Sequence, residues 1–154
     1  MRPIFVSRTL AASSSNNICL SQTPGGAGAL TLNGSTVSGG VATLDAQRVV
    51  GITSAGNDTA RTFVITGQDE QGNVISESLA GASGATASSI LNYKKVTSIT
   101  IDGAAAGAIT VGTTGVGSSV AVPLDQYISP FNPTLAVEVT GTLNYDVQYT
   151  EDDP

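Results

Sequence analysis

The sequence RTFVITGQDEQGNVISESLA, residues 61–80, carries the clearest hairpin pattern in the chain. Two β-prone runs flank the turn-forming residues 68–73, and Gly72 is placed to adopt the positive φ that closes a three-residue hairpin with a bulge. If Asp69 and Asn73 close the loop, one face is mostly apolar. The residues expected on that face are Phe63 opposite Leu79, Ile65 opposite Glu77, and Ile75.

The rest of the chain repeats this pattern of short β-prone runs between turn formers. A strand is expected at 18–22, and the Asn33-Gly34 pair predicts a type I′ turn joining strands at 29–32 and 35–37. A further hairpin is expected between 96–101 and 108–112, and a strand at 120–124. A closing pair is expected at 134–140 and 142–150. Turns or loops are expected at 54–59, at 81–89 (with a helical turn at most over 85–88) and at the proline-rich residues 128–133.

Two segments carry more specific patterns. Residues 44–50 fit either one helical turn or a strand, and the β-branched Val49, Val50 and Ile52 favour a strand that continues to Thr53. Residues 142–150 alternate strictly, with polar residues between the members of one apolar face. That face consists of Leu143, Tyr145, Val147 and Tyr149.

Turn signals about every 8 to 12 residues, without a long helical pattern, indicate an all-β fold: an antiparallel β-sandwich or a jelly roll. We expect one such domain at residues 18–154 and an extended N-terminal arm at residues 1–17. The apolar Ile4, Phe5 and Val6 need burial, yet the polar stretch 13–17 gives no sign of folding them back. They are therefore the predicted protein-interaction residues, because a strand added to the edge of a partner's sheet would bury them.

The composition is dominated by small side chains, with 18 Gly and only 5% aromatic residues. A core of this kind buries little apolar area per residue, so an isolated monomer would be only modestly stabilised. The composition therefore favours a homo-oligomer, with a homotrimer preferred and a homodimer next. A monomeric sandwich with thin walls is the alternative.

Charge and cysteine content exclude several classes. The net charge of −6 argues against nucleic acid, because only Lys94 and Lys95 are adjacent cations. Cys19 is the single cysteine, so neither an intrachain disulfide nor a thiolate metal site is expected, and a buried inert thiol is favoured. No apolar run has the length of a membrane helix, and no secretory signal follows Arg2 and Arg8, which predicts a soluble product of the cytoplasm.

The sequence offers little catalytic chemistry, and we expect no enzyme, cofactor or metal. It has no histidine, which removes the usual general base and the common metal ligand. Acid pairs remain conceivable, but the carboxylates occupy turn-like positions. The candidates are Asp69, Glu70, Glu77, Asp102 and Asp125. The glycine-rich runs 25–28 and 112–117 lack the GK[ST] ending of a phosphate loop, and the acidic residues 151–153 are expected to be solvated.

The segment 61–77 resembles small structural proteins of tailed bacteriophages. The residues that carry the resemblance are Arg61, Ile65, Gly67, Asp69, Gly72-Asn73, Ile75 and Glu77. The ending 143–153 and residues 96–112 extend it to about half of the chain. Within that group, the size and β-rich composition look most like capsid decoration (cement) proteins. The resemblance implies a virion protein on the outer capsid surface, made in the host bacterial cytoplasm, with the major capsid protein and copies of itself as partners.

Two other functions are compatible with the same sequence. One is another virion component, such as a head-completion, tail or fibre domain. The other is a carbohydrate-binding β-sandwich, which the scarcity of aromatic side chains for stacking disfavours.

Overall fold

The computed structural model describes residues 4–123 and 134–148, and these residues contain β-strands and no α-helix. The all-β expectation is confirmed. The chain divides into two compact units, Met1–Val120 and Ala121–Pro154, and every strand found in the described residues belongs to the first. The strands are β1 (Ser14–Gln22), β2 (Gly28–Ala29), β3 (Val37–Ser38), β4 (Val41–Asn57), β5 (Thr62–Gln68), β6 (Val74–Ala80), β7 (Ser83–Ile101) and β8 (Ile109–Ser118).

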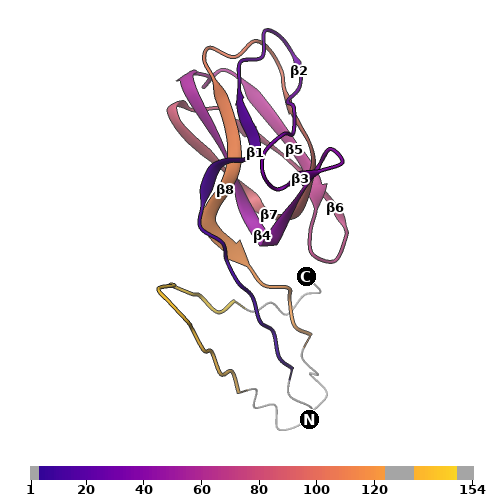
Figure 1. The fold of residues 1–154 in the computed structure, drawn as a ribbon, viewed down its shortest axis with the longest axis vertical. Helices are drawn as coiled ribbons and strands as arrows, with labels where there is room; N and C mark the ends of the chain where they lie inside the picture. Colours follow the sequence, from indigo (N-terminus) through magenta and orange to yellow (C-terminus); the bar gives the residue numbers. More distant parts are fainter. Residues whose placement is uncertain (1–3, 124–133, 149–154) are drawn as a thin grey trace. The chain divides into compact units, whose positions relative to one another are not determined.

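The strands form one open antiparallel sheet in the order β1-β8-β4-β7-β5-β6 (Figure 1). The two-residue strands β2 and β3 lie off this path, beside β7 and β4. The described strands therefore make a single sheet, and neither the two sheets of a sandwich nor the strand order of a jelly roll is established.

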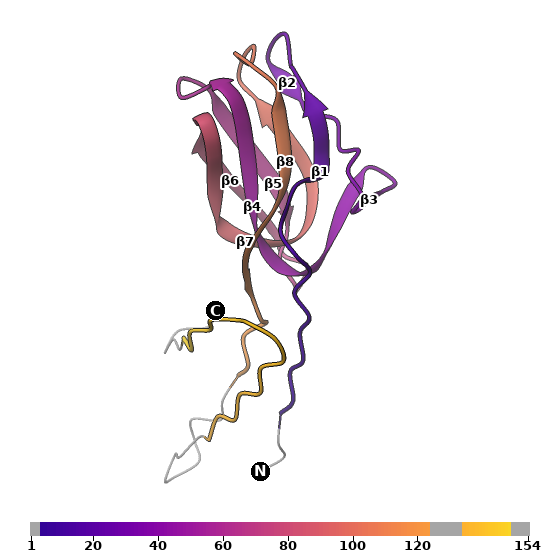
Figure 2. The ribbon, with the colours of Figure 1, turned by 60° about the vertical axis from the view of Figure 1, so that its left-hand side comes forward.

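The long strands β4 and β7 bend the sheet (Figure 2). Their pairing is interrupted between Thr43 and Arg48, where β4 carries extra residues, and between Val49 and Gly51, where β7 carries the extra residues around Ile90. Bulges of this kind kink a strand and increase its twist. As a result the first half of β7 pairs with β4 while its second half also pairs with β5 and β2.

The bent sheet encloses one hydrophobic core. Side chains from β1, β4, β5, β7 and β8 are almost fully buried together, which a flat single sheet would not achieve. The core residues are Ile18, Cys19, Leu30, Ala42, Leu44, Val50, Ile52, Phe63, Ile65, Tyr93, Val96, Ile99, Ile101, Ile109 and Val111. The prediction that Cys19 is buried is confirmed, and this burial raises the pKa of its thiol to about 12.

The hairpin at 61–80 is confirmed as β5 and β6. Phe63 pairs with Leu79 and Ile65 with Glu77, and Gly72 has a φ of +91°. Asp69 closes the loop, because its backbone amide donates to the Asn73 carbonyl at 3.1 Å and its carboxylate accepts from the Asn73 amide at 2.8 Å. Turn chemistry and strand period agree here, which explains why the sequence predicted the register.

The predicted Asn33-Gly34 hairpin is wrong. The backbone amides of both residues donate to the Ile18 carbonyl of β1, at 3.2 and 2.9 Å, and Gly34 does not have a positive φ. A Cβ on Gly34 would lie 2.2 Å from the Asn17 carbonyl carbon. Gly34 therefore allows the loop to dock on the edge of β1, and this close approach replaces the expected turn.

Three further expectations within the sheet are corrected. Residues 44–53 do form a strand, as preferred, but β4 continues to Asn57 through the expected turn at 54–59. The expected loop at 81–89 is largely the first half of β7, since its small residues pair with β4. Strands exist at 96–101 and 109–112, but they do not form the predicted hairpin, because β4 lies between β7 and β8.

The strands expected near the C-terminus are not observed in the described residues. No strand is assigned over 120–123 or over 134–148. Leu124, the proline-rich segment 128–133 and residues 149–150 lie outside the described residues.

Candidate interaction surfaces

The predicted interaction residues lie exposed at the start of the described chain. Ile4 is 63% exposed, Phe5 is 89% exposed and Val6 is 38% exposed, and the structure brings none of them to a site on the sheet. The exposed side chains are available to a partner. Their role in binding remains a prediction.

The polar residues that follow fasten this segment to the sheet. Arg8 forms an ion pair with Glu70 of the β5–β6 loop. The Ala11 amide donates to the Asp45 carboxylate at 2.6 Å, and the Ala11 carbonyl accepts from Arg48 at 3.1 Å. Strand β1 then begins at Ser14, inside the range 1–17 expected for the arm.

Asp45 and Arg48 of β4 form the clamp on Ala11. Arg48 is 1% exposed, and it donates to Asp45 at 2.9 Å and to the Thr114 carbonyl at 2.5 Å. Burial opposes ionisation of Asp45, but the amide bonds from Ala11 and Ala46 and the nearby Arg48 together hold its pKa below the ordinary range. Asp45 is therefore ionised at neutral pH, and the two side chains together bind the backbone amide and the backbone carbonyl of Ala11.

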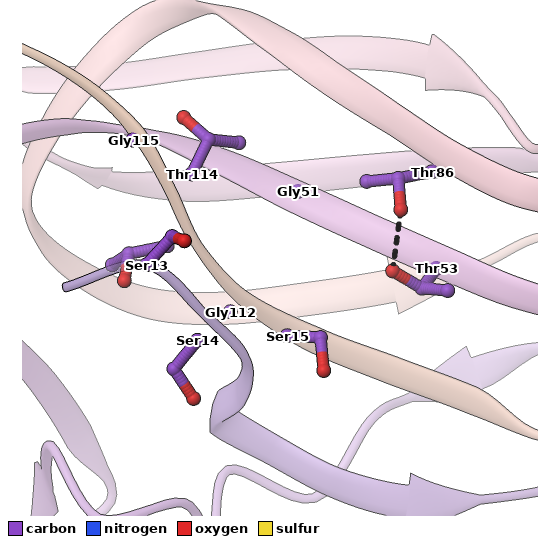
Figure 3. A pocket seen from close by; sticks show the side chains of 10 residues that line it. Ser13, Ser14, Ser15, Gly51, Thr53, Thr86, Gly112, Thr114 and Gly115 are labelled. Carbon is purple, nitrogen blue, oxygen red and sulfur yellow. Dashed lines mark hydrogen bonds between the residues drawn. The ribbon is translucent and has the colours of Figure 1, made fainter.

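A hollow of about 310 Å³ lies where β1 starts beside β8 (Figure 3). Its lining consists of hydroxyl side chains and glycines, with no charged, aromatic or thiol group: Ser13, Ser14, Ser15, Gly51, Thr53, Thr86, Gly112, Thr113, Thr114 and Gly115. The Thr53 and Thr86 hydroxyls bond each other at 2.7 Å. Without a base to activate a hydroxyl, this lining supports no nucleophilic or acid–base chemistry.

The acidic candidates are dispersed and occupied by local contacts. Asp69 caps the hairpin loop, Glu70 pairs with Arg8, and Asp102 lies 4.0 Å from Arg61. Glu77 accepts from the backbone amides of Ile90 and Leu91 in β7, at 3.0 and 3.4 Å. Asp125 lies outside the described residues. No group of three potential metal-binding side chains occurs within residues 4–123 and 134–148.

The bulge of β7 presents one large apolar side chain to solvent. Ile90 is 88% exposed, while its amide donates to the Glu77 carboxylate at 3.0 Å. The Ser89 hydroxyl accepts from the Val50 amide at 2.9 Å and donates to the Leu91 carbonyl at 2.8 Å. The bulge is thus fixed by side-chain hydrogen bonds on both sides. The loop expected from the sequence covers 81–89 and ends before Ile90, so the bulge was not predicted.

Residues 134–148 expose apolar side chains at alternate positions. The exposed side chains are Leu135 (64%), Val137 (45%), Val139 (38%), Leu143 (48%), Tyr145 (55%) and Val147 (61%). Gly141, between the two runs, has a φ of +95°. The apolar residues that alternate in the sequence are therefore 38–64% exposed in the structure.

The charge is divided unequally between the two units. All six basic residues lie in residues 1–120, where six acidic residues balance them. Residues 121–154 contain the other six acidic residues and no basic one, so they carry the entire net charge of −6: Asp125, Glu138, Asp146, Glu151, Asp152 and Asp153.

Comparison with family models, curated proteins and solved structures found no match to this chain. Within residues 4–123 and 134–148, no helix is long and apolar enough to cross a membrane. The functional argument therefore starts from the surfaces described above.

Proposed function

We propose that this protein is a bacteriophage virion structural protein, and specifically a capsid decoration protein that binds the outer surface of the head and bridges neighbouring capsomers. It acts without catalysis or a cofactor. Its partners are the major capsid protein and copies of itself. The proposal starts from the resemblance of residues 61–77 and 143–153 to small structural proteins of tailed phages.

The observation that carries the proposal is the N-terminal segment. Its exposed Ile4 and Phe5 extend from a root that the Asp45–Arg48 pair fixes to the middle of the sheet. A short apolar segment on a fixed root suits attachment to a neighbouring protein by strand addition. The hydroxyl-lined hollow and the dispersed carboxylates give no comparable support for an enzyme.

The finer architecture belongs to the same proposal. We take the bent sheet to act as a sandwich-like body, in which its two halves cover one core, because Phe63 and Ile109 are both fully buried. A rigid body of this kind covers a broad shallow surface, and repetition over a symmetric shell adds many weak contacts into tight attachment.

The test uses heads assembled without the protein. Adding the full chain should restore DNA retention under heat, chelator or osmotic stress, with hundreds of copies bound per head. The double variant Ile4→Asp/Phe5→Asp should bind much more weakly. The matched control Val74→Asp/Val116→Asp adds the same charge at positions that are 73% and 59% exposed on the sheet, and it should bind as well as the parent.

Two results would overturn the proposal. Stripped and decorated heads that retain DNA equally under every stress would exclude a cementing role. A handful of copies per particle, together with a tail defect in phage lacking the protein, would assign it to the neck or tail.

A further inference from the structure

We propose that residues 134–148 form a β-hairpin whose apolar face packs against the same face of another copy of this chain. The inference does not rest on the proposed function, since it concerns the isolated protein. It identifies the segment through which the chain associates with itself.

The positions of the apolar residues fit one hairpin. A turn centred on Gly141, whose φ is +95°, places Val139 opposite Leu143, Val137 opposite Tyr145 and Leu135 opposite Val147. Opposite residues of a hairpin point to the same face, so all six side chains share one face. Ala136, Glu138, Asn144, Asp146 and Gln148 take the other face.

This hairpin needs a cover. A two-stranded hairpin alone is at best marginally stable in water, and three or more strands or a packed face are needed. The structure agrees with that rule, because residues 134–148 have no assigned strand and their apolar side chains are exposed. The missing contribution is burial of the apolar face.

The distribution of charge on the hairpin indicates which kind of partner can cover its apolar face. Glu138 and Asp146 lie on the polar face, so a basic partner would bind there and leave the apolar face open. The apolar face needs an uncharged apolar complement. Besides the run 4–6, which is too short to cover six side chains, the first unit offers only separate exposed apolar residues such as Leu20 on β1, Val74 on β6 and Ile90 on β7. The same face of another copy is apolar throughout, and pairing the two buries no charge.

The area indicates a weak, concentration-dependent association. The six side chains are 38–64% exposed, so they represent roughly 200–350 Å² of apolar surface per chain, since fully burying an exposed Val or Leu removes about 60–120 Å² from water. Two faces together give roughly 400–700 Å², which is less than the roughly 1,000 Å² of a stable specific interface, so the protein has to be measured at high concentration. Stacked sheets pack about 10 Å apart, which the large Leu and Tyr side chains fill.

The first experiment measures molar mass by light scattering during size exclusion, using the full chain up to about 100 μM. The parent should elute as a multiple of its 15.4 kDa monomer mass. Val137→Asp/Tyr145→Asp should be monomeric, whereas Ala136→Asp/Asn144→Asp, with the same charge on the polar face, should keep the parent's mass. Unchanged circular dichroism and melting of the β1–β8 sheet would show that neither variant unfolds it.

The second experiment is disulfide cross-linking through one cysteine introduced on either face of the hairpin. Because Cys19 is fully buried, a cysteine introduced at 145 or 146 is the accessible thiol. Under mild oxidation Tyr145→Cys should form a disulfide-linked dimer much faster than Asp146→Cys.

A monomeric parent at every concentration would overturn the inference, as would an apolar-face variant that keeps the parent's mass or equal cross-linking of the two cysteine variants. If the parent is monomeric alone but loses particle binding with Val137→Asp/Tyr145→Asp, the face belongs to a different protein and self-association is excluded.

Discussion

The clamp between Asp45 and Arg48 leads to an asymmetric prediction: removing the acid destabilises the fold more than removing the base. In Asp45→Ala the guanidinium of Arg48 stays 99% buried and charged, with the carbonyls of Ala11 and Thr114 as its remaining partners. Breaking a buried ion pair by removing one partner typically costs about 3–5 kcal/mol, and the two carbonyls reduce the expected loss to about 2–4 kcal/mol.

Arg48→Met removes the buried charge itself, so no unpaired charge is left inside the protein. The Asp45 side chain is 29% exposed, so water can solvate it, and it still accepts the Ala11 amide. The expected loss is about 1–2 kcal/mol, mainly from lost hydrogen bonds and packing. For a chain of this length these values correspond to a Tm lower by roughly 6–12 °C for Asp45→Ala and roughly 3–6 °C for Arg48→Met.

The assay is urea unfolding followed by far-ultraviolet circular dichroism, with the double variant completing a thermodynamic cycle. The double variant should be more stable than Asp45→Ala alone, because it no longer contains the orphaned charge. Arg61→Met and Asp102→Ala provide the control, since this pair is 4.0 Å apart with both side chains about 40% exposed or more, and each change should cost less than about 1 kcal/mol. A loss for Arg48→Met equal to or larger than that for Asp45→Ala would refute the reasoning.

Two further predictions concern acid and the docked loop. The pKa of Asp45 is lower in the folded protein than its ordinary value of 3.8, so its stabilising contribution is complete above pH 3.8 and is lost as the pH falls through the lowered value. The difference in unfolding free energy between the parent and Asp45→Asn should therefore shrink over that acid range. A constant difference would contradict the assignment. Gly34→Ala should destabilise the protein by about 2–4 kcal/mol, because the added Cβ would meet the rigid backbone of Asn17. Gly115→Ala is the control, because open space surrounds Gly115, and it should change stability by less than about 1 kcal/mol. Equal effects of the two changes in denaturant unfolding would show that the loop relaxes away from β1.

The parts of the fold that the sequence predicted are those that neighbouring residues determine. Residues 61–80 contain their own turn chemistry, strand period and partner, so the register of β5 and β6 followed from local rules. The pairing of β8 with β4 depends on residues far apart in sequence, and nothing local distinguishes it from a β7–β8 hairpin. Residues 83–89 were missed because Ser, Gly and Ala have weak β-propensity, which pairing with β4 overrides.

The interaction surfaces divide in the same way. The apolar character of Ile4 and Phe5 showed in the sequence, and the structure leaves them exposed. The Asp45–Arg48 clamp was missed, although one signal was present: Arg48 is a charged residue beside the apolar run 49–50, and a charge in a buried strand requires a partner. That partner included the backbone of Ala11, which no pattern of side chains indicates.

The position of the clamp also determines how the protein would respond to a pulling force. About seven residues separate Ala11 from Ile4, so a partner that binds Ile4 lies within roughly 25 Å of the clamp when the segment is fully extended. Tension on this segment would first load the Arg8–Glu70 ion pair, and once that pair breaks it would pass through Asp45 and Arg48 into β4, which lies between β7 and β8. The force is then shared by two rows of backbone hydrogen bonds, whereas a segment anchored to β6 would separate that edge strand from the sheet one hydrogen bond at a time.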